Sequence, residues 1–198
     1  TFPMTVNHDD LWSFEGKNVP IHWHNDLEIN LIREGEAVFQ VYQKSYRVRT
    51  GEGFLLNRNV PHSCSSPGNE HVRYSTILVR PDFLYGDFGS DVERKCFQPF
   101  LQNSAIPCIH LTGFDENGKE ILWKLNQVEE AFDRKRFCYE LKIKGLLCEA
   151  FAMILYGHRQ ELTKFVPANL QELERLEKML NYLNMHFTEV ISLQDLAD

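Results

Sequence analysis

The sequence predicts a mainly β fold that is followed by amphipathic helices. Up to about residue 110 the apolar residues fall in short runs that are separated by Gly, Pro and Asn, a pattern typical of antiparallel strands in a barrel or sandwich. From Glu116 onward the apolar residues recur every three or four positions, which is the period of a helix. Hydrophobic residues at 43% and charged residues at 25% predict a packed core.

Length and charge narrow the class of protein further. A chain of 198 residues has room for one domain, or for one domain and a fragment of another. The net charge of −7 argues against binding to a phosphate backbone by bulk electrostatics. The sequence has no apolar run as long as a membrane span and no signal-peptide pattern, so no membrane partner is expected. Five cysteines without a C-x-x-C pair predict small buried side chains in a reducing cytoplasm.

Strands are expected in the first part of the chain, over residues 1–112. Five runs carry the prediction because each is rich in β-branched or aromatic residues and ends at a turn former. These runs are "LEINLI", "AVFQVY", "YRVRT", "GFLLN" and "RYSTILV".

Two amphipathic helices are expected over residues 113–158. The first has apolar residues at helical spacing, and the second runs from about Phe137 to Tyr156, with Gly157 well placed to end it. Their apolar stripes need a partner, which is either the sheet, the other helix or a second subunit. The stripe of the first helix consists of Ile121, Leu122, Leu125, Val128 and Phe132.

A linker and the start of a further helical domain are expected after the helix pair. Residues 159–169 are polar and contain a proline, which predicts the linker. Asn169 with Glu172, and later Ser192 with Asp195, have the spacing of helix N-caps and their partners. The last helix would be one turn long at Asp198, so we expect a truncated domain over residues 170–198.

Histidines dominate the candidate site. In an extended segment His22, His24 and Glu28 would share one face, and His62 in "NVPHSC" is the candidate fourth member from another strand. Three His and one Glu suit Zn, Ni, Mn or Fe(II), with positions left open for water or substrate. The alternative is that these residues only form hydrogen bonds inside a barrel.

This spacing resembles the first motif of the cupin superfamily. Gly16-x5-His22-x-His24-x3-Glu28-x6-Gly35 agrees with that motif at every defined position. The second motif is looser: Gly51 and His62 stand at the expected spacing, but Asn57, Asn59 and Ser66 replace the usual Pro, Gly and Asn. Asn tolerates the left-handed conformation of a turn glycine. The resemblance implies a double-stranded β-helix barrel with His22, His24, Glu28 and His62 at its mouth.

The end of the chain resembles the start of the DNA-binding domain of AraC-family transcription regulators. Such regulators have a cupin-type sensor, dimerising helices, a linker and two helix-turn-helix units. This chain lacks the recognition helix, so binding to DNA is expected only through a missing C-terminal part. The residues that carry the resemblance are Tyr182, Phe187, Ile191, Ser192, Leu193, Leu196 and Ala197.

The two resemblances together imply the sensor and dimerisation region of a cytoplasmic regulator, not an enzyme. It would form a homodimer and bind a sugar or small organic acid in the barrel mouth, with no cofactor certain and a divalent metal possible. A metal-dependent cupin dioxygenase or isomerase is the rival. In "HVRYSTILV" strand parity leaves open whether Arg73 and Ser75, or Tyr74 and Thr76, face inward. The expected ligand-binding residues are His22, His24, Glu28, Asn30, His62 and Arg73.

Overall fold

The computed structural model of the chain describes residues 2–68 and 70–164, together with Met179 and Tyr182. The expected start of a DNA-binding domain at 170–198 therefore lies outside the described residues, apart from those two positions. None of the helices within the described ranges is long and apolar enough to span a bilayer.

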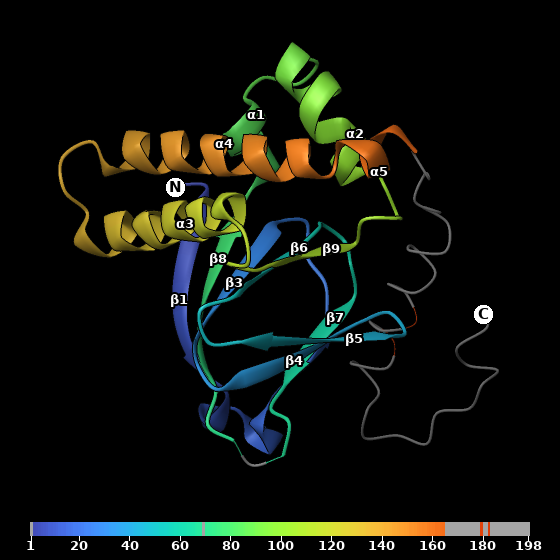
Figure 1. Cartoon of the computed structure of the whole chain (residues 1–198), viewed down its shortest axis with the longest axis vertical. Coiled ribbons are helices and arrows are strands. Elements are labelled where there is room, and N and C mark those ends of the chain that lie inside the picture. Colours follow the sequence, from blue (N-terminus) through green and yellow to red (C-terminus); the bar gives the residue numbers. More distant parts are fainter. Residues whose placement is uncertain (1, 69, 165–178, 180–181, 183–198) are drawn as a thin grey trace.

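Two antiparallel sheets form the body of the molecule (Figure 1). The five-stranded sheet has the order β1 (Met4–Asp10), β8 (Arg73–Val79), β3 (Leu27–Glu34), β6 (Gly53–Leu56) and β9 (Cys108–Leu111). The four-stranded sheet has the order β2 (Asn18–His22), β7 (His62–Ser65), β4 (Glu36–Val41) and β5 (Lys44–Arg49). The mainly β prediction is confirmed, and each of the five predicted runs coincides with a strand, although Tyr42, Thr50 and Asn57 lie just beyond the strand ends.

Apolar side chains fill the space between the two sheets. Phe39 of β4 stacks on Phe54 of β6 with ring centroids 4.8 Å apart, and the same interior cluster includes Val41, Val48 and Leu56. Residues along each strand alternate between this interior and the outer face, so β3 places Ile32 inside and Ile29 and Leu31 outside.

Two long helices cover the outer face of the five-stranded sheet. The helices are α3 (Glu116–Arg134) and α4 (Tyr139–Gly157), and they lie side by side in Figure 1. Both were predicted, including the end of α4 at Gly157. A Cβ at Gly53 would meet Leu122 at 3.2 Å, so this glycine lets α3 approach β6 closely. The apolar stripe packs on the sheet, and its buried members are Ile121, Leu122, Leu125 and Val128.

Short helices interrupt the chain where only strands and turns were expected. They are α1 (Pro81–Tyr85), the π-helical turn η3 (Glu93–Phe97) and α2 (Gln98–Leu101), and two 3-10 turns, η1 (Leu11–Ser13) and η2 (Glu15–Lys17), follow β1. Phe97 packs on Phe151 of α4 with ring centroids 5.7 Å apart, which explains why this segment leaves the barrel. The expected linker also begins differently, because its first five residues form α5 (Arg159–Thr163).

Candidate functional site

The four residues of the predicted quartet come together at one end of the barrel. Their ligating atoms, one from each residue, all lie within 4.8 Å of one another. His22 ends β2 and is the cross-strand partner of His62 in β7, whereas Glu28 belongs to β3 in the other sheet. A shared face required the segment to be extended throughout, but residues 23–26 form a bent connection between β2 and β3. The quartet therefore sits where the two sheets meet.

The backbone fixes the orientation of all three imidazoles. Nδ1 of His22 lies 2.9 Å from the Pro20 carbonyl, Nδ1 of His24 lies 3.1 Å from that of Asp26, and Nδ1 of His62 lies 2.7 Å from that of Val60. Because a carbonyl only accepts, each Nδ1 carries the proton. Each imidazole can then direct its Nε2 toward the other members of the quartet.

Glu28 supplies the negative charge of the site. Its carboxylate accepts hydrogen bonds from His24 Nε2 at 2.8 Å and from Asn30 Nδ2 at 2.7 Å. Burial alone would raise the pKa of Glu28, but the hydrogen bonds from His24 and Asn30, together with the nearby His62 imidazole, outweigh it and hold this pKa well below its usual range. The carboxylate is therefore ionised although its side chain is only 8% exposed.

The histidines differ in charge because their neighbours differ. Burial, followed by the adjacent His62, lowers the pKa of His22, so its Nε2 keeps a free lone pair at neutral pH. Burial also works against the charged form of His24, but the bond to Glu28 prevails and raises its pKa. Nε2 of His62 lies 3.3 Å from Glu28 Oε2, yet it is buried and has no hydrogen-bond partner in the described chain.

A row of polar side chains continues from Glu28 across the inner face of the five-stranded sheet. Asn30 is fully buried and accepts a hydrogen bond from Thr76 at 3.0 Å. Thr76 also contacts Asp9 of β1 at 3.2 Å. Burial raises the pKa of Asp9. The sequence did not point to Asp9, because β1 is too polar to show the alternation of a half-buried strand.

Arg73 does not join the other expected ligand-binding residues. Its side chain is exposed and pairs with Glu34. Of the two alternatives that parity left open in β8, the structure has Tyr74 and Thr76 facing the interior, while Ser75 faces α3 through Glu129. Arg73 is therefore corrected to a surface residue, because a strand presents only every second side chain to the barrel.

Two turn residues of the motif take the left-handed conformation that their loops require. Gly35 has a φ of 79°, and a Cβ there would meet the His71 carbonyl oxygen at 2.2 Å. Asn59 takes the left-handed conformation with a φ of 57°, as expected for a residue that replaces a turn glycine. The Asn59 N–H donates to the His24 carbonyl at 2.8 Å, which ties the loop of His24 to the turn before His62.

The donor set fits a divalent transition metal. Imidazole Nε2 atoms and one carboxylate are ligands for Zn, Ni, Mn or Fe(II), and an Nδ1–H bonded to a carbonyl is the usual support of a ligating histidine. The partnerless Nε2 of buried His62 is an acceptor that an ion or a ligand donor would satisfy. A hydroxyl or amine of a small molecule meets the same requirement.

A double-stranded β-helix with this quartet at one end places the protein in the cupin class of barrels. Residues 11–108 match the family described as AraC-like ligand binding domain. That part of the chain is an AraC-like ligand-binding domain.

Two further comparisons extend over most of the chain. It is 24% identical over 180 residues to the uncharacterised HTH-type transcriptional regulator YdeC of Bacillus subtilis (strain 168), with 90% of this chain and 60% of that protein covered. The chain thus spans about 60% of this relative's length.

The fold is similar to that of ToxT from Vibrio cholerae, with 15% identity, a TM-score of 0.54 and 98% and 69% of the two chains covered. A ToxT structure bound to (E)-4-(8-methylnaphthalen-1-yl)but-3-enoic acid matches with 14% identity and a TM-score of 0.54, and covers 98% and 70%.

Proposed function

We propose that this chain is the effector-sensing and dimerisation region of an AraC-family transcription regulator. One observation carries the proposal: three backbone-oriented Nε2 atoms and an ionised, buried carboxylate meet at the barrel mouth. A small molecule with hydroxyl or carboxylate groups would bond to His22 and His62 and replace the contact between His24 and Glu28. Its different affinity for two arrangements of the regulator would shift their populations.

The binding site that we propose consists of His22, His24, Glu28, Asn30 and His62. The ToxT ligand is a carboxylic acid, which supports the inclusion of small organic acids beside sugars among the candidate effectors. Asn30 contributes indirectly, because its amide and its carbonyl are already bonded to Glu28 and Thr76. It orients the carboxylate toward the effector.

A thermal-shift screen of sugars and small organic acids tests this site. The full chain and the His62→Ala variant are compared, with His71→Ala as the matched control, because His71 is partly exposed and pairs with Asp10 away from the quartet. An effector should raise the melting temperature of the parent and of the control and leave that of His62→Ala unchanged. An equal rise in all three proteins would contradict the site.

A divalent metal is the second candidate ligand of the quartet, favoured by the orientation of the three Nε2 atoms. If the metal supported catalysis, the chain would be a cupin enzyme of the dioxygenase or isomerase type. Metal analysis after chelation and reconstitution with Zn, Ni, Mn or Fe(II) separates the roles. One tightly bound ion per chain together with turnover of a substrate would replace the regulator proposal, whereas stabilisation by a metabolite in chelated protein would support it.

The homodimer that we propose uses the side of α4 that faces away from the sheet. Five residues of α4 at spacings of three and four form an exposed stripe, which we call the α4 stripe: Leu141, Gly145, Glu149, Ala152 and Tyr156. Gly145 and Ala152, on either side of Glu149, are small enough to let a second helix approach closely, and the apolar residues at the ends of the stripe gain from burial. A two-fold dimer would match paired half-sites on DNA, the partner that we propose for the whole regulator in the cytoplasm.

A further inference from the structure

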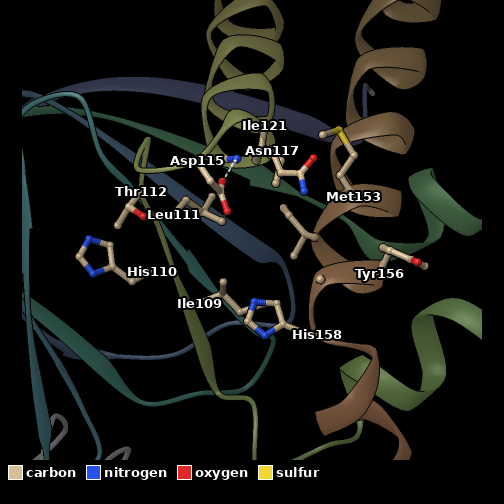
Figure 2. Close-up of a pocket in the computed structure, with 13 residues that line it drawn as sticks. Ile109, His110, Leu111, Thr112, Asp115, Asn117, Ile121, Met153, Tyr156 and His158 are labelled. Carbon is tan, nitrogen blue, oxygen red and sulfur yellow. Dashed lines mark hydrogen bonds between the residues drawn. The ribbon is translucent and has the colours of Figure 1, made fainter.

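A cavity, which we call the groove, lies outside the barrel, at the junction of the outer helices and β9. It has a volume of about 330 Å³, which is within the range of small-molecule sites. Figure 2 shows it between β9, the first turn of α3 and the last turns of α4. Its floor is apolar and consists of Ile109, Leu111, Ile121, Met153 and Ile154.

The rim of this groove carries polar side chains that have no internal partner. Within the described residues the side chains of Thr112, Asn117 and His158 make no hydrogen bond, and all three line the groove. In Figure 2 Asn117 enters from α3 and His158 from the end of α4. An apolar floor with a few hydrogen-bonding groups at its edge is the usual composition of a small-molecule site.

The walls of the groove are held rigidly. Gly118 packs so closely on β9 that a Cβ would lie 1.9 Å from the Thr112 carbonyl oxygen. Asp115 caps α3 by accepting a hydrogen bond from the Gly118 N–H at 2.7 Å. On the β9 side, His110 is fixed by a bond of 2.9 Å between its Nε2 and Glu52. A cavity with fixed walls costs little to organise when it is filled.

We propose that this groove is a second ligand site, which takes an uncharged aromatic or heteroaromatic molecule with amide or hydroxyl substituents. The ring would lie on the apolar floor, and its substituents would reach the Asn117 amide and the His158 imidazole. The lining contains one carboxylate, Asp115, and no Lys or Arg. An anion would be repelled by Asp115, and a cation would compete with the helix cap for the same oxygens. The site goes beyond the barrel-mouth function and does not depend on it.

A ligand in this groove would contact the start of α5, the segment that follows the two long helices. His158 follows the last residue of α4 and directly precedes α5 (Arg159–Thr163). The α5 backbone is in turn held by Asn103, whose Nδ2 lies 3.4 Å from the Glu161 carbonyl oxygen. A molecule that bonds to His158 therefore acts on the start of the segment that leads away from the barrel.

Methyl NMR of the full chain with labelled Ile and Met tests the proposal. Benzamide and indole serve as neutral probes, and benzoate serves as the charged comparison. The methyl groups of Ile109, Ile121, Met153 and Ile154 report on the groove, and the methyl group of Ile32, which lies in the barrel interior, reports on the barrel. We expect saturable shifts of the groove methyls with both neutral probes, weaker binding of benzoate and no shift at Ile32.

Two groove variants and one control variant locate the binding. Asn117→Trp fills the groove from an exposed position and should weaken benzamide binding at least tenfold, while Glu140→Trp, at an exposed position in the first turn of α4, should leave it unchanged. His158→Ala, which only removes a rim group, should weaken binding three- to tenfold and serves if Asn117→Trp does not fold. Shifts confined to Ile32, unchanged affinity in both groove variants, tighter binding of benzoate than of benzamide, or the absence of saturable shifts would each overturn the proposal.

Discussion

Gly118 and Gly145 lie in two neighbouring helices and have opposite roles. A Cβ at Gly118 would collide with the Thr112 carbonyl oxygen, whereas a Cβ at Gly145 would have no heavy atom within 4 Å. Gly118→Ala should therefore lower the free energy of unfolding by about 1–3 kcal/mol, the cost of overpacking a rigid contact. Gly145→Ala should raise it by about 0.5–1 kcal/mol, because alanine favours the helix.

Urea unfolding of the two variants and of the parent measures both effects. A change of the same sign in both variants would contradict the close packing of α3 on the end of β9. The unfolding measurement needs no ligand, because the prediction for each glycine depends only on its contacts within one chain.

The cysteines differ in exposure, and this difference predicts their reactivity. Burial raises the pKa of the Cys64 thiol far above its usual range and also raises that of Cys148. Cys96 and Cys138 are exposed. Because the thiolate is the reactive form, iodoacetamide at pH 8 should modify Cys96 and Cys138 at least tenfold faster than Cys64. Peptide mass spectrometry over time measures the rates, and equal rates would show that the barrel interior opens readily.

At the scale of elements, Arg33 ties α3 to the sheet. Its guanidinium bonds to Asn126 and Glu129 of α3 and to Ser75 of β8. Arg33→Ala would leave Glu129, whose side chain is 14% exposed, without its cation. Glu129 would keep its bond from Ser75 but lose its charged donor, so we expect the free energy of unfolding to fall by about 1–3 kcal/mol, the contribution of a hydrogen bond to a charged group.

Arg73→Ala is the matched control for Arg33, since it removes an exposed pair with Glu34 on the same sheet. Exposed pairs contribute about 0–1 kcal/mol, so this variant should unfold close to the parent. If urea unfolding showed the same loss of stability in both variants, Arg33 would contribute no more than an exposed arginine and would not hold α3 on the sheet.

Sequence patterns predicted the elements whose periodicity is strong. Alternation in β3 placed Glu28 and Asn30 on the inner face, and helical spacing located α3 and α4. The bent connection at residues 23–26 was not foreseen, because His22, His24 and Glu28 have the spacing of a single strand. Their convergence depends instead on pairing between β2 and β7, which is a long-range contact. The placement of Arg73 was wrong for a related reason. Alternation in β8 allows either Arg73 and Ser75 or Tyr74 and Thr76 to face inward, and only the contact of Ser75 with α3 decides between them.

At the scale of the whole molecule, the α4 stripe predicts the behaviour of the dimer. Gly145→Arg places a long charged side chain at the centre of the stripe, where nothing in one protomer obstructs it. Sedimentation should show a monomer at concentrations where the parent is a dimer, while the melting temperature of the protomer fold is not lowered, because arginine favours a helix more than glycine.

Gly145→Ala is the control for this experiment and should keep the dimer, since alanine preserves close approach. A dimeric Gly145→Arg protein would contradict the proposed interface. A monomeric parent would contradict the dimer itself and leave the barrel-mouth site untouched.

The two faces of strand β3 contact different parts of the molecule. Glu28 and Asn30 face the barrel interior, where Glu28 contacts the histidines, while Ile29, Leu31 and Arg33 face the helices. In a hydrogen-bonded strand these alternate residues move together. A shift of β3 on the side of the candidate site would therefore also shift the side that contacts the helices. In the mechanism that we propose, an effector that displaced the Glu28 carboxylate would act through β3 on α3 and, through α3, on the face of α4 where the proposed partner would bind.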